Sequence, residues 1–353
     1  MLMPARESSA PSLAGAAGVG AQFKQLLAQG AGDLPLPGAG QTLSRWRALA
    51  EVASQDLSLA KLFEGHTDAL AIQRELGADP VPPGSSWGTW AAEPPDAKVL
   101  FIPASSRGEV ILRGKKAWCS GAEIVSHGLL TVWGGQRGCE GIDPSDGPWL
   151  ARVDMRQPGV RVSRDGWVAV GMSDSASVQV EFDGARAQLV GEAGDYLRRP
   201  GFWQGGAGIA ACWWGGARAL ASALHAASNG KPDPFRLSAL GKIDLALAQT
   251  AAVLREAAAW IDANPQADAS AVATRARLSA EAAARVVLDE AGRSLGAGPF
   301  CRDADFARMA ADLPVFVRQS HAERDFAFLG GKIAALTAAG TATGPARVGP
   351  WSL

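Results

Sequence analysis

The sequence predicts an α+β, multi-domain fold in which helices come first, a sheet follows and helices finish the chain. Three observations predict this order. Apolar residues recur at helical spacing near the start of the chain and again throughout its second half. Short runs rich in Val, Leu and Trp, separated by Gly, Pro or Asp turns, fill the middle. Nine of the twelve tryptophans lie between Trp87 and Trp214, which marks the middle as compositionally distinct.

The N-terminal part is predicted to be helical after a loose start. Residues 1–40 are rich in Ala, Gly, Ser and Pro, with one short helical candidate at Phe23–Ala28. Between Thr42 and Leu76, apolar residues recur at spacings of three and four, which predicts helices with one apolar face. Ser44 is the predicted N-cap, and Gly and Pro residues after Leu76 end the helical stretch.

The middle of the chain is predicted to form a sheet. The expected strands lie within residues 110–118, 129–133, 149–155, 160–170 and 178–182. Since no helical pattern intervenes, the regular spacing indicates an antiparallel barrel or sandwich and argues against a Rossmann unit.

The second half is predicted to consist of long helices. They are expected at Phe202–Ala227, Pro234–Asp262, Ser270–Leu295 and Asp303–Leu329, the last with a break at residues 312–314, before a loose tail. The first of these helices includes an uncharged run of eighteen residues from Pro200 to Ala217. Six of these residues are Gly, so the run favours a tightly packed core helix over a membrane span.

Composition excludes several classes of protein. The chain carries 34 basic and 35 acidic residues, which argues against a sequence-blind nucleic-acid binder and against a basic membrane patch. Four scattered cysteines without a CxxC pair predict a reducing, cytoplasmic setting. Four histidines without metal-ligand spacing signal no metal site, and the N-terminus lacks the apolar core of a signal peptide.

Four local strings, in order along the chain, resemble the acyl-CoA dehydrogenase superfamily. They span residues 50–70, 108–122, 171–191 and 310–331. The resemblance extends from about Ser44 to Gly331. It implies a shortened N-terminal helical domain over residues 1–85 and a central antiparallel β-barrel over residues 86–195. A C-terminal four-helix bundle over residues 196–337 and a tail over residues 338–353 complete the predicted chain.

The second string, which contains GKKAWCSGA, is similar to the strand that passes beside the flavin in this family. Carried over, the resemblance places the Trp118 indole against the isoalloxazine ring and the Ser120 hydroxyl near flavin N5 and O4. Gly121 would let the backbone come close to the flavin, and Cys119, between Trp118 and Ser120, is a further predicted cofactor contact. A flat, reducible ring needs an aromatic wall and a few placed polar groups. Without the family, the residues alone favour Trp118 as a barrel core residue and Ser120 as a turn hydroxyl, because aromatic side chains are usually buried for packing; the resemblance reverses that preference.

The stretch Thr89–Pro94 resembles the family's Thr-Glu-Pro loop at the start of the barrel in part. Only Glu93-Pro94 matches, and the residues that usually follow are absent. Thr89 is the second predicted flavin contact. The altered loop puts substrate contacts there in doubt.

The family's catalytic glutamate, which removes an α-proton, is not found where the resemblance predicts it. Counting from Asp312 reaches Gln319 and Ser320. Glu323 is the nearest acid, in a run of charged residues typical of a solvated surface. His321 is the other candidate, because histidine titrates near neutral pH and serves as acid or base. His321, Glu323 and Gln319 are therefore the predicted catalytic residues.

The family's phosphate-binding arginine is also displaced. Arg236 follows Phe235 where the family places an arginine three residues before the phenylalanine, and Lys231 is the other candidate cation. The turn at residues 296–298 resembles the Gly-Gly turn through which a neighbouring subunit reaches FAD.

The resemblance implies an FAD-binding oxidoreductase that oxidises a CH–CH bond of an acyl-CoA or related small acid. Its electron acceptor would be an electron-transfer flavoprotein or oxygen. Two alternatives stay open: a reduced-flavin monooxygenase of the same fold, and a degenerate member that scaffolds a partner. The missing glutamate favours the alternatives, and the GKKAWCSGA string favours flavin. Small-residue and outward apolar helix faces predict a homodimer or homotetramer.

Overall fold

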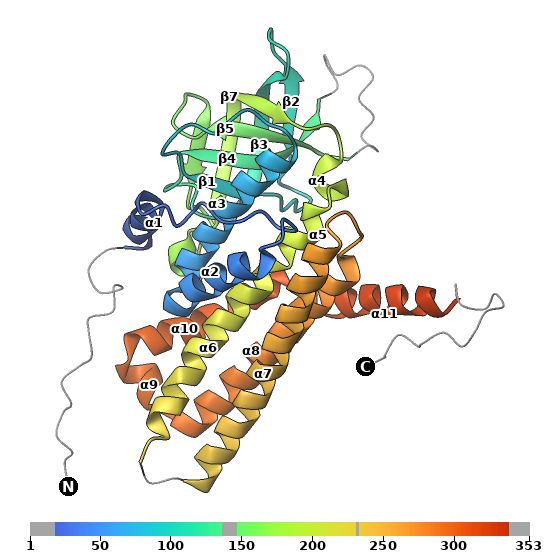
Figure 1. Ribbon diagram of the computed structural model, residues 1–353. Helices are drawn as coiled ribbons and strands as arrows, with labels where there is room; N and C mark the ends of the chain where they lie inside the picture. The colour runs from blue at the N-terminus through green and yellow to red at the C-terminus, as the bar shows by residue number, and fades with distance from the viewer. Residues whose placement is uncertain (1–17, 136–146, 231–232, 339–353) are drawn as a thin grey trace.

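The computed structural model describes residues 18–135, 147–230 and 233–338, and it has the predicted helix–sheet–helix order. The sheet lies at one end of the molecule and the long helices at the other (Figure 1). The helices before the sheet are α1 (Val19–Ala28), α2 (Thr42–Gln55) and α3 (Leu57–Glu75). Figure 1 shows α3 running from the helical end up along the sheet.

The predicted helical stretch from Thr42 consists of two helices. Asp56 separates them in an extended conformation, and its carboxylate accepts the Leu59 N–H at 2.7 Å as the N-cap of α3. Ser44 is not an N-cap, because α2 begins at Thr42 after Gln41. The Asp262 carboxylate holds that end instead, since it accepts from both the backbone N–H and the hydroxyl of Thr42.

Seven strands form one sheet that closes on itself as a barrel. They are β1 (Trp87–Trp90), β2 (Val99–Pro103), β3 (Glu109–Cys119), β4 (His127–Gly134), β5 (Trp149–Asp154), β6 (Val160–Ser163) and β7 (Val178–Val190). The strand order is β1-β4-β2-β3-β7-β5, and a further β4–β5 pairing closes the ring. The predicted antiparallel arrangement is wrong at two places, because β4 pairs in parallel with both β1 and β2.

One predicted strand is shorter than expected. The run from Val160 was expected to continue to Val170, but β6 ends at Ser163. Val168 and Val170 are 89% and 84% exposed. Their alternation is typical of a strand, but the β6–β7 pairing covers only Val160–Ser163. A short 3-10 helix, η3 (Ser173–Ser175), follows.

The C-terminal helices pack around α6 (Gly208–Ala227) and α8 (Ser270–Leu295). The others are α4 (Asp195–Arg198), α5 (Gly201–Gly206), α7 (Pro234–Ala263), α9 (Ala297–Arg302), α10 (Ala304–Phe316), η4 (Val317–Gln319) and α11 (Glu323–Ala338). α7 begins with Pro at its first position and Asp233 as N-cap. Among the described residues, α7 alone is long and apolar enough to cross a membrane; it packs lengthwise against α8 (Figure 1).

The last predicted helix breaks at a different place. Pro314 lies inside α10, and the break comes after Phe316. There the chain passes through η4, an extended Ser320 and Ala322 in the left-handed region at φ 48°. The predicted catalytic residues Gln319, His321 and Glu323 are therefore spread over a turn and the start of a second helix.

A buried ion pair braces the barrel interior. Lys116 on β3 is fully buried, and its Nζ lies 3.1 Å from the Glu93 carboxylate and 2.5 Å from the Thr131 hydroxyl. Thr131 and the Trp133 indole also donate to Glu93. Burial opposes ionisation, but the hydrogen bonds from Thr131 and Lys116 hold the pKa of Glu93 below its usual value.

We expect Glu93→Gln to destabilise the protein by about 2–4 kcal/mol, because it leaves Lys116 as an uncompensated charge inside the barrel. The double variant Glu93→Gln/Lys116→Met removes that charge and should recover most of the loss. Urea unfolding at neutral pH measures both. A double variant no more stable than Glu93→Gln would contradict this account.

Candidate functional site

The end of β3 carries the most unusual residue of the structure. β3 pairs with β7, but the register slips between Lys116 and Cys119, so β3 contains one extra residue. Trp118 takes up the slip at φ 59°, a left-handed conformation that is rare for a bulky residue. Its side chain is 59% exposed, whereas Lys116 and Cys119 are fully buried. The bulge thus turns one indole out of the barrel.

A chain of hydroxyl groups lies directly beyond the bulge. The Ser120 Oγ is 2.7 Å from the Ser177 Oγ, which is 3.0 Å from the Ser175 Oγ. The Ser175 hydroxyl donates to the Met172 carbonyl oxygen at 2.8 Å. Ser120 and Ser175 are buried, so this polar row is ordered beside an exposed aromatic surface.

Helix α3 holds this strand end against the start of the barrel. A Cβ added to Gly121, at φ 68°, would meet the Leu62 side chain at 2.9 Å, so only glycine fits there. The Thr89 hydroxyl on β1 donates to the Gly65 carbonyl oxygen of the same helix at 2.7 Å. The Trp90 indole donates to the Ser120 carbonyl oxygen. The predicted residues Thr89, Ser120 and Gly121 are thereby brought together next to Trp118.

Cys119 faces the other way. Its thiol is buried in the barrel and donates to the Lys116 carbonyl oxygen at 3.3 Å. Burial raises the pKa of the Cys119 thiol, so it stays protonated and unreactive. Only the backbone of Cys119, and not its thiol, can therefore make the predicted flavin contact.

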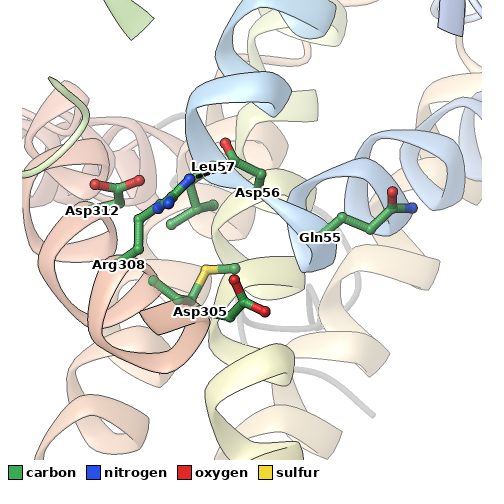
Figure 2. Close-up of a pocket in the computed structure, with 7 residues that line it drawn as sticks. Gln55, Asp56, Leu57, Asp305, Arg308 and Asp312 are labelled. Atoms are coloured by element: carbon green, nitrogen blue, oxygen red, sulfur yellow. Dashed lines mark ion pairs between the residues drawn. The ribbon is translucent and has the colours of Figure 1, made fainter. Parts of the chain in front are cut away.

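A cluster of charged residues contacts the segment around η3. Figure 2 shows Asp56, Arg308 and Asp312 of this cluster. The Asp312 carboxylate of α10 accepts the Met172 N–H at 2.6 Å, and Met172 is itself left-handed at φ 60°. Arg308 reaches the N-cap carboxylate Asp56 at 3.6 Å and Asp174 at 3.7 Å. These contacts tie the N-terminal helices, the barrel and α10 together at one point.

The same carboxylates line a small pocket. Its lining residues are Gln55, Asp56, Leu57, Asp305, Arg308, Met309 and Asp312. Burial, more than the neighbouring Asp56, raises the pKa of Asp312 to about 6. Burial likewise raises the pKa of Asp56. No group of three or more potential metal ligands is found among the described residues.

The predicted catalytic residues lie elsewhere, on the segment from η4 to α11. The Gln319 carbonyl oxygen accepts from Arg277 of α8 at 2.8 Å. His321 is 69% exposed, with its Nδ1 3.5 Å from the Asp325 carboxylate. Glu323 is exposed on the first turn of α11. No contact recorded within the described ranges joins these residues to Trp118 or Ser120, and their catalytic roles stay predictions.

The structure also shows where one of the two candidate phosphate-binding residues lies. Arg236 donates to the Ala227 carbonyl oxygen at 2.8 Å, so it closes the C-terminal end of α6. Lys231 lies outside the described residues. Gly296 lies at φ 66° as the N-cap of α9, and the other residues of the predicted turn, Ala297 and Gly298, begin that helix; the approach of a second subunit to FAD there stays a prediction.

Sequence reasoning missed the support of the site. Asp312 served only as a landmark for counting, and Ser175 and Ser177 carried no prediction. Two signals were present: a Ser-rich turn directly before a strand, and a lone acid within the apolar run of α10. Neither signal shows that the turn and the acid are partners, because Met172 before the turn and Asp312 lie 140 residues apart.

The chain is similar in structure to several solved proteins, some of them described with FMN. One is KijD3, described in complex with FMN and a dTDP-3-amino-4-keto sugar: TM-score 0.73 and 19% identity, covering 90% of this chain and 86% of that one. The chain has the acyl-CoA dehydrogenase fold. A nitrososynthase from Micromonospora carbonacea var. africana gives TM-score 0.71 and 18% identity, over 88% of each chain.

Dibenzothiophene monooxygenase from Paenibacillus sp. A11-2 gives TM-score 0.67 and 19% identity, covering 88% of this chain and 94% of that chain. Neither a family model nor a curated protein sequence matches the chain. At this identity the likeness establishes the fold, and the predicted resemblance is confirmed at that level.

The residues around Trp118 fit a flavin ring. An exposed indole held by its own strained backbone offers a flat surface, and the adjacent Ser120 offers a polar atom at its edge. The free energy gained by stacking a ring on that surface would offset part of the roughly 1–3 kcal/mol that a left-handed backbone costs.

Asp312 makes stability depend on pH. Because its pKa is raised in the folded state, the native protein holds this proton more tightly than the unfolded chain, and stability falls as pH rises through about 6. We expect Asp312→Asn to be more stable than wild type by about 1–3 kcal/mol near pH 8, and this gain to fall close to zero near pH 3.5, below the ordinary pKa of an aspartate. Urea unfolding at both pH values measures it. A gain of equal size at both would contradict the assignment.

Proposed function

We propose that the protein is a flavin-dependent oxidoreductase that carries its flavin ring against Trp118, and that it acts as a monooxygenase. The exposed, left-handed Trp118 beside the Ser120 hydroxyl is the observation that carries the flavin proposal. When bound, reduced flavin supplies two electrons to oxygen, and one oxygen atom is transferred to the substrate.

The residues of the site would position and shield the ring. Trp118 offers its indole as a stacking surface, and Ser120 places one hydroxyl oxygen at the ring edge. Thr89 on β1 and Gly121 after β3 both contact α3, which thereby holds these two parts of the site at a fixed distance. The proposal gives Cys119 no chemical role.

The contacts and exposure of the acidic residues between η4 and α11 favour oxygen chemistry over dehydrogenation. An α-proton is weakly acidic, so acyl thioester oxidation requires a carboxylate in a dry site. Asp325 is engaged as a cap, accepting the His321 N–H at 3.0 Å, and Glu323 is exposed to solvent. Oxidation of an acyl-CoA at a CH–CH bond is thus the second candidate, and it depends on Glu323.

The cofactor is proposed to be FMN. The resemblance predicts FAD, but the arginine nearest to the expected phosphate contact, Arg236, is bound to the end of α6. Similar structures are described with FMN, including KijD3 and the Paenibacillus enzyme. Titration with both cofactors separates the two, since FAD should bind no more tightly than FMN if its additional phosphate and adenosine find no contacts.

Trp118→Ala should weaken FMN binding by about 1–3 kcal/mol, or roughly 5- to 150-fold, because the stacking surface is lost. Quenching of flavin fluorescence on titration into the protein measures the dissociation constant. Trp133→Ala is the matched control and should bind FMN as wild type does, because the Trp133 indole donates to Glu93 and, among the described residues, has no recorded bond to Trp118 or Ser120. Equal affinity of Trp118→Ala and wild type would refute the proposed site.

His321 is the proposed proton-transferring residue. His321→Ala should lower turnover about 100-fold, in line with the loss of one general acid–base group, whereas Glu323→Gln should change it less than twofold. Reduced FMN, oxygen and indole serve as the assay, with oxygenated indole detected by mass spectrometry. Anaerobic bleaching of bound flavin by butyryl-CoA, abolished by Glu323→Gln alone, would favour the dehydrogenase candidate instead.

A homo-oligomer is proposed on the outer face of α7. Phe235, Leu237 and Leu245 are 86%, 44% and 58% exposed there, an apolar surface of the kind that a symmetric copy covers. Sedimentation velocity at micromolar concentration should give a dimer or tetramer, and Leu245→Glu should shift it towards monomer. A wild-type monomer would refute the proposal. We propose a cytoplasmic setting, in keeping with the free thiols of Cys119 and Cys212.

A further inference from the structure

The hydroxyl row at Ser120 has a direction, because each hydroxyl group has only one hydrogen to donate. The row ends at the Met172 carbonyl oxygen, which accepts and cannot donate. Ser175 therefore uses its hydrogen on that oxygen, at 2.8 Å. Its Oγ can only accept from Ser177, at 3.0 Å. Ser177 has then used its hydrogen and can only accept from Ser120, at 2.7 Å.

The fixed end of the row is rigid. Met172 and Ala176, on either side of η3, are both left-handed, at φ 60° and 39°. The Met172 N–H is bound to the buried Asp312 carboxylate, and the Ser175 N–H donates to the same carbonyl oxygen that receives its hydroxyl. Reversing the row would require the Met172 carbonyl to lose its hydroxyl donor.

The direction decides what Ser120 offers to a ligand. Its one hydrogen is committed to Ser177, and its backbone groups bond to Trp90 and Trp118. The Ser120 Oγ therefore presents lone pairs and no hydrogen towards any further group. Such an oxygen pairs well with an N–H and poorly with another acceptor.

Oxidised and reduced flavin differ in this respect. In the oxidised ring N5 is an acceptor, and after two-electron reduction it carries a hydrogen and becomes a donor. We infer that Ser177 and Ser175 are positioning residues that hold Ser120 as an acceptor, and that the site thereby selects reduced over oxidised flavin. This rests on the proposed function, because it takes the flavin edge to lie at Ser120.

The test compares the dissociation constants of oxidised FMN and of dithionite-reduced FMN under anaerobic conditions. Wild type should bind the reduced form more tightly. Ser177→Ala frees the Ser120 hydrogen to turn towards the ligand, so the preference should fall by about tenfold. For a two-electron couple, tenfold corresponds to a decrease of about 30 mV in the midpoint potential of the bound flavin.

Ser175→Ala is the second variant and should shift the preference in the same direction, because Ser177 can then donate to Ser120. Ser173→Ala is the matched control: Ser173 lies on the same turn and is exposed, and within the described part of the chain its hydroxyl bonds only to the Asp174 carboxylate. It should keep the wild-type preference. Circular dichroism confirms that each variant is folded.

The outcomes separate the two levels of the argument. If Ser177→Ala and Ser175→Ala bind FMN with the wild-type preference, the inference is overturned and the flavin site stands. The same holds if wild type shows no preference. If wild type binds neither form, or Trp118→Ala binds both as well as wild type does, the proposed function fails and the inference fails with it.

Discussion

One extra residue in β3 is the constraint on which the site depends. In a regular ladder, alternate side chains point to opposite faces, so Trp118 would follow Lys116 into the barrel. The bulge interrupts that alternation: Lys116 and Cys119 stay buried, and the indole between them is exposed. The slip also brings Ser120 to the turn at η3, where its hydroxyl meets Ser177. An aromatic surface and a polar edge are thus produced by a single irregularity in the pairing of two strands.

The strain at the bulge is held by contacts from three parts of the chain. Lys116 is anchored inside the barrel by Glu93, α3 closes on Gly121, and Asp312 fixes the turn that carries the serines. Two of these three anchors are charged groups in poorly solvated surroundings, which cost free energy to bury. A protein that keeps such groups at one junction retains them for position more than for stability. The pKa of about 6 at Asp312 is the mark of that cost.

Sequence reasoning reached the architecture because its signals are local. α8 was predicted with its observed bounds, since a long helical period ends at Gly296, and α7 begins at the predicted Pro234. The break between α10 and α11 was misplaced because Pro314 is tolerated inside the helix. The true break comes after Phe316 and ends at Ala322, whose left-handed backbone no residue type predicts. At the site, Trp118 and Ser120 could be named only through a family resemblance. The serine row and Asp312 could not, because contacts across 57 and 140 residues leave no local pattern.

The most direct test of this account is a crystal structure of the protein grown with FMN. The account predicts the isoalloxazine ring stacked on the Trp118 indole, with one ring nitrogen or oxygen within hydrogen-bond distance of the Ser120 Oγ and the β3 bulge unchanged. A ring bound at another surface, or Trp118 turned into the barrel with a regular β3–β7 register, would contradict it.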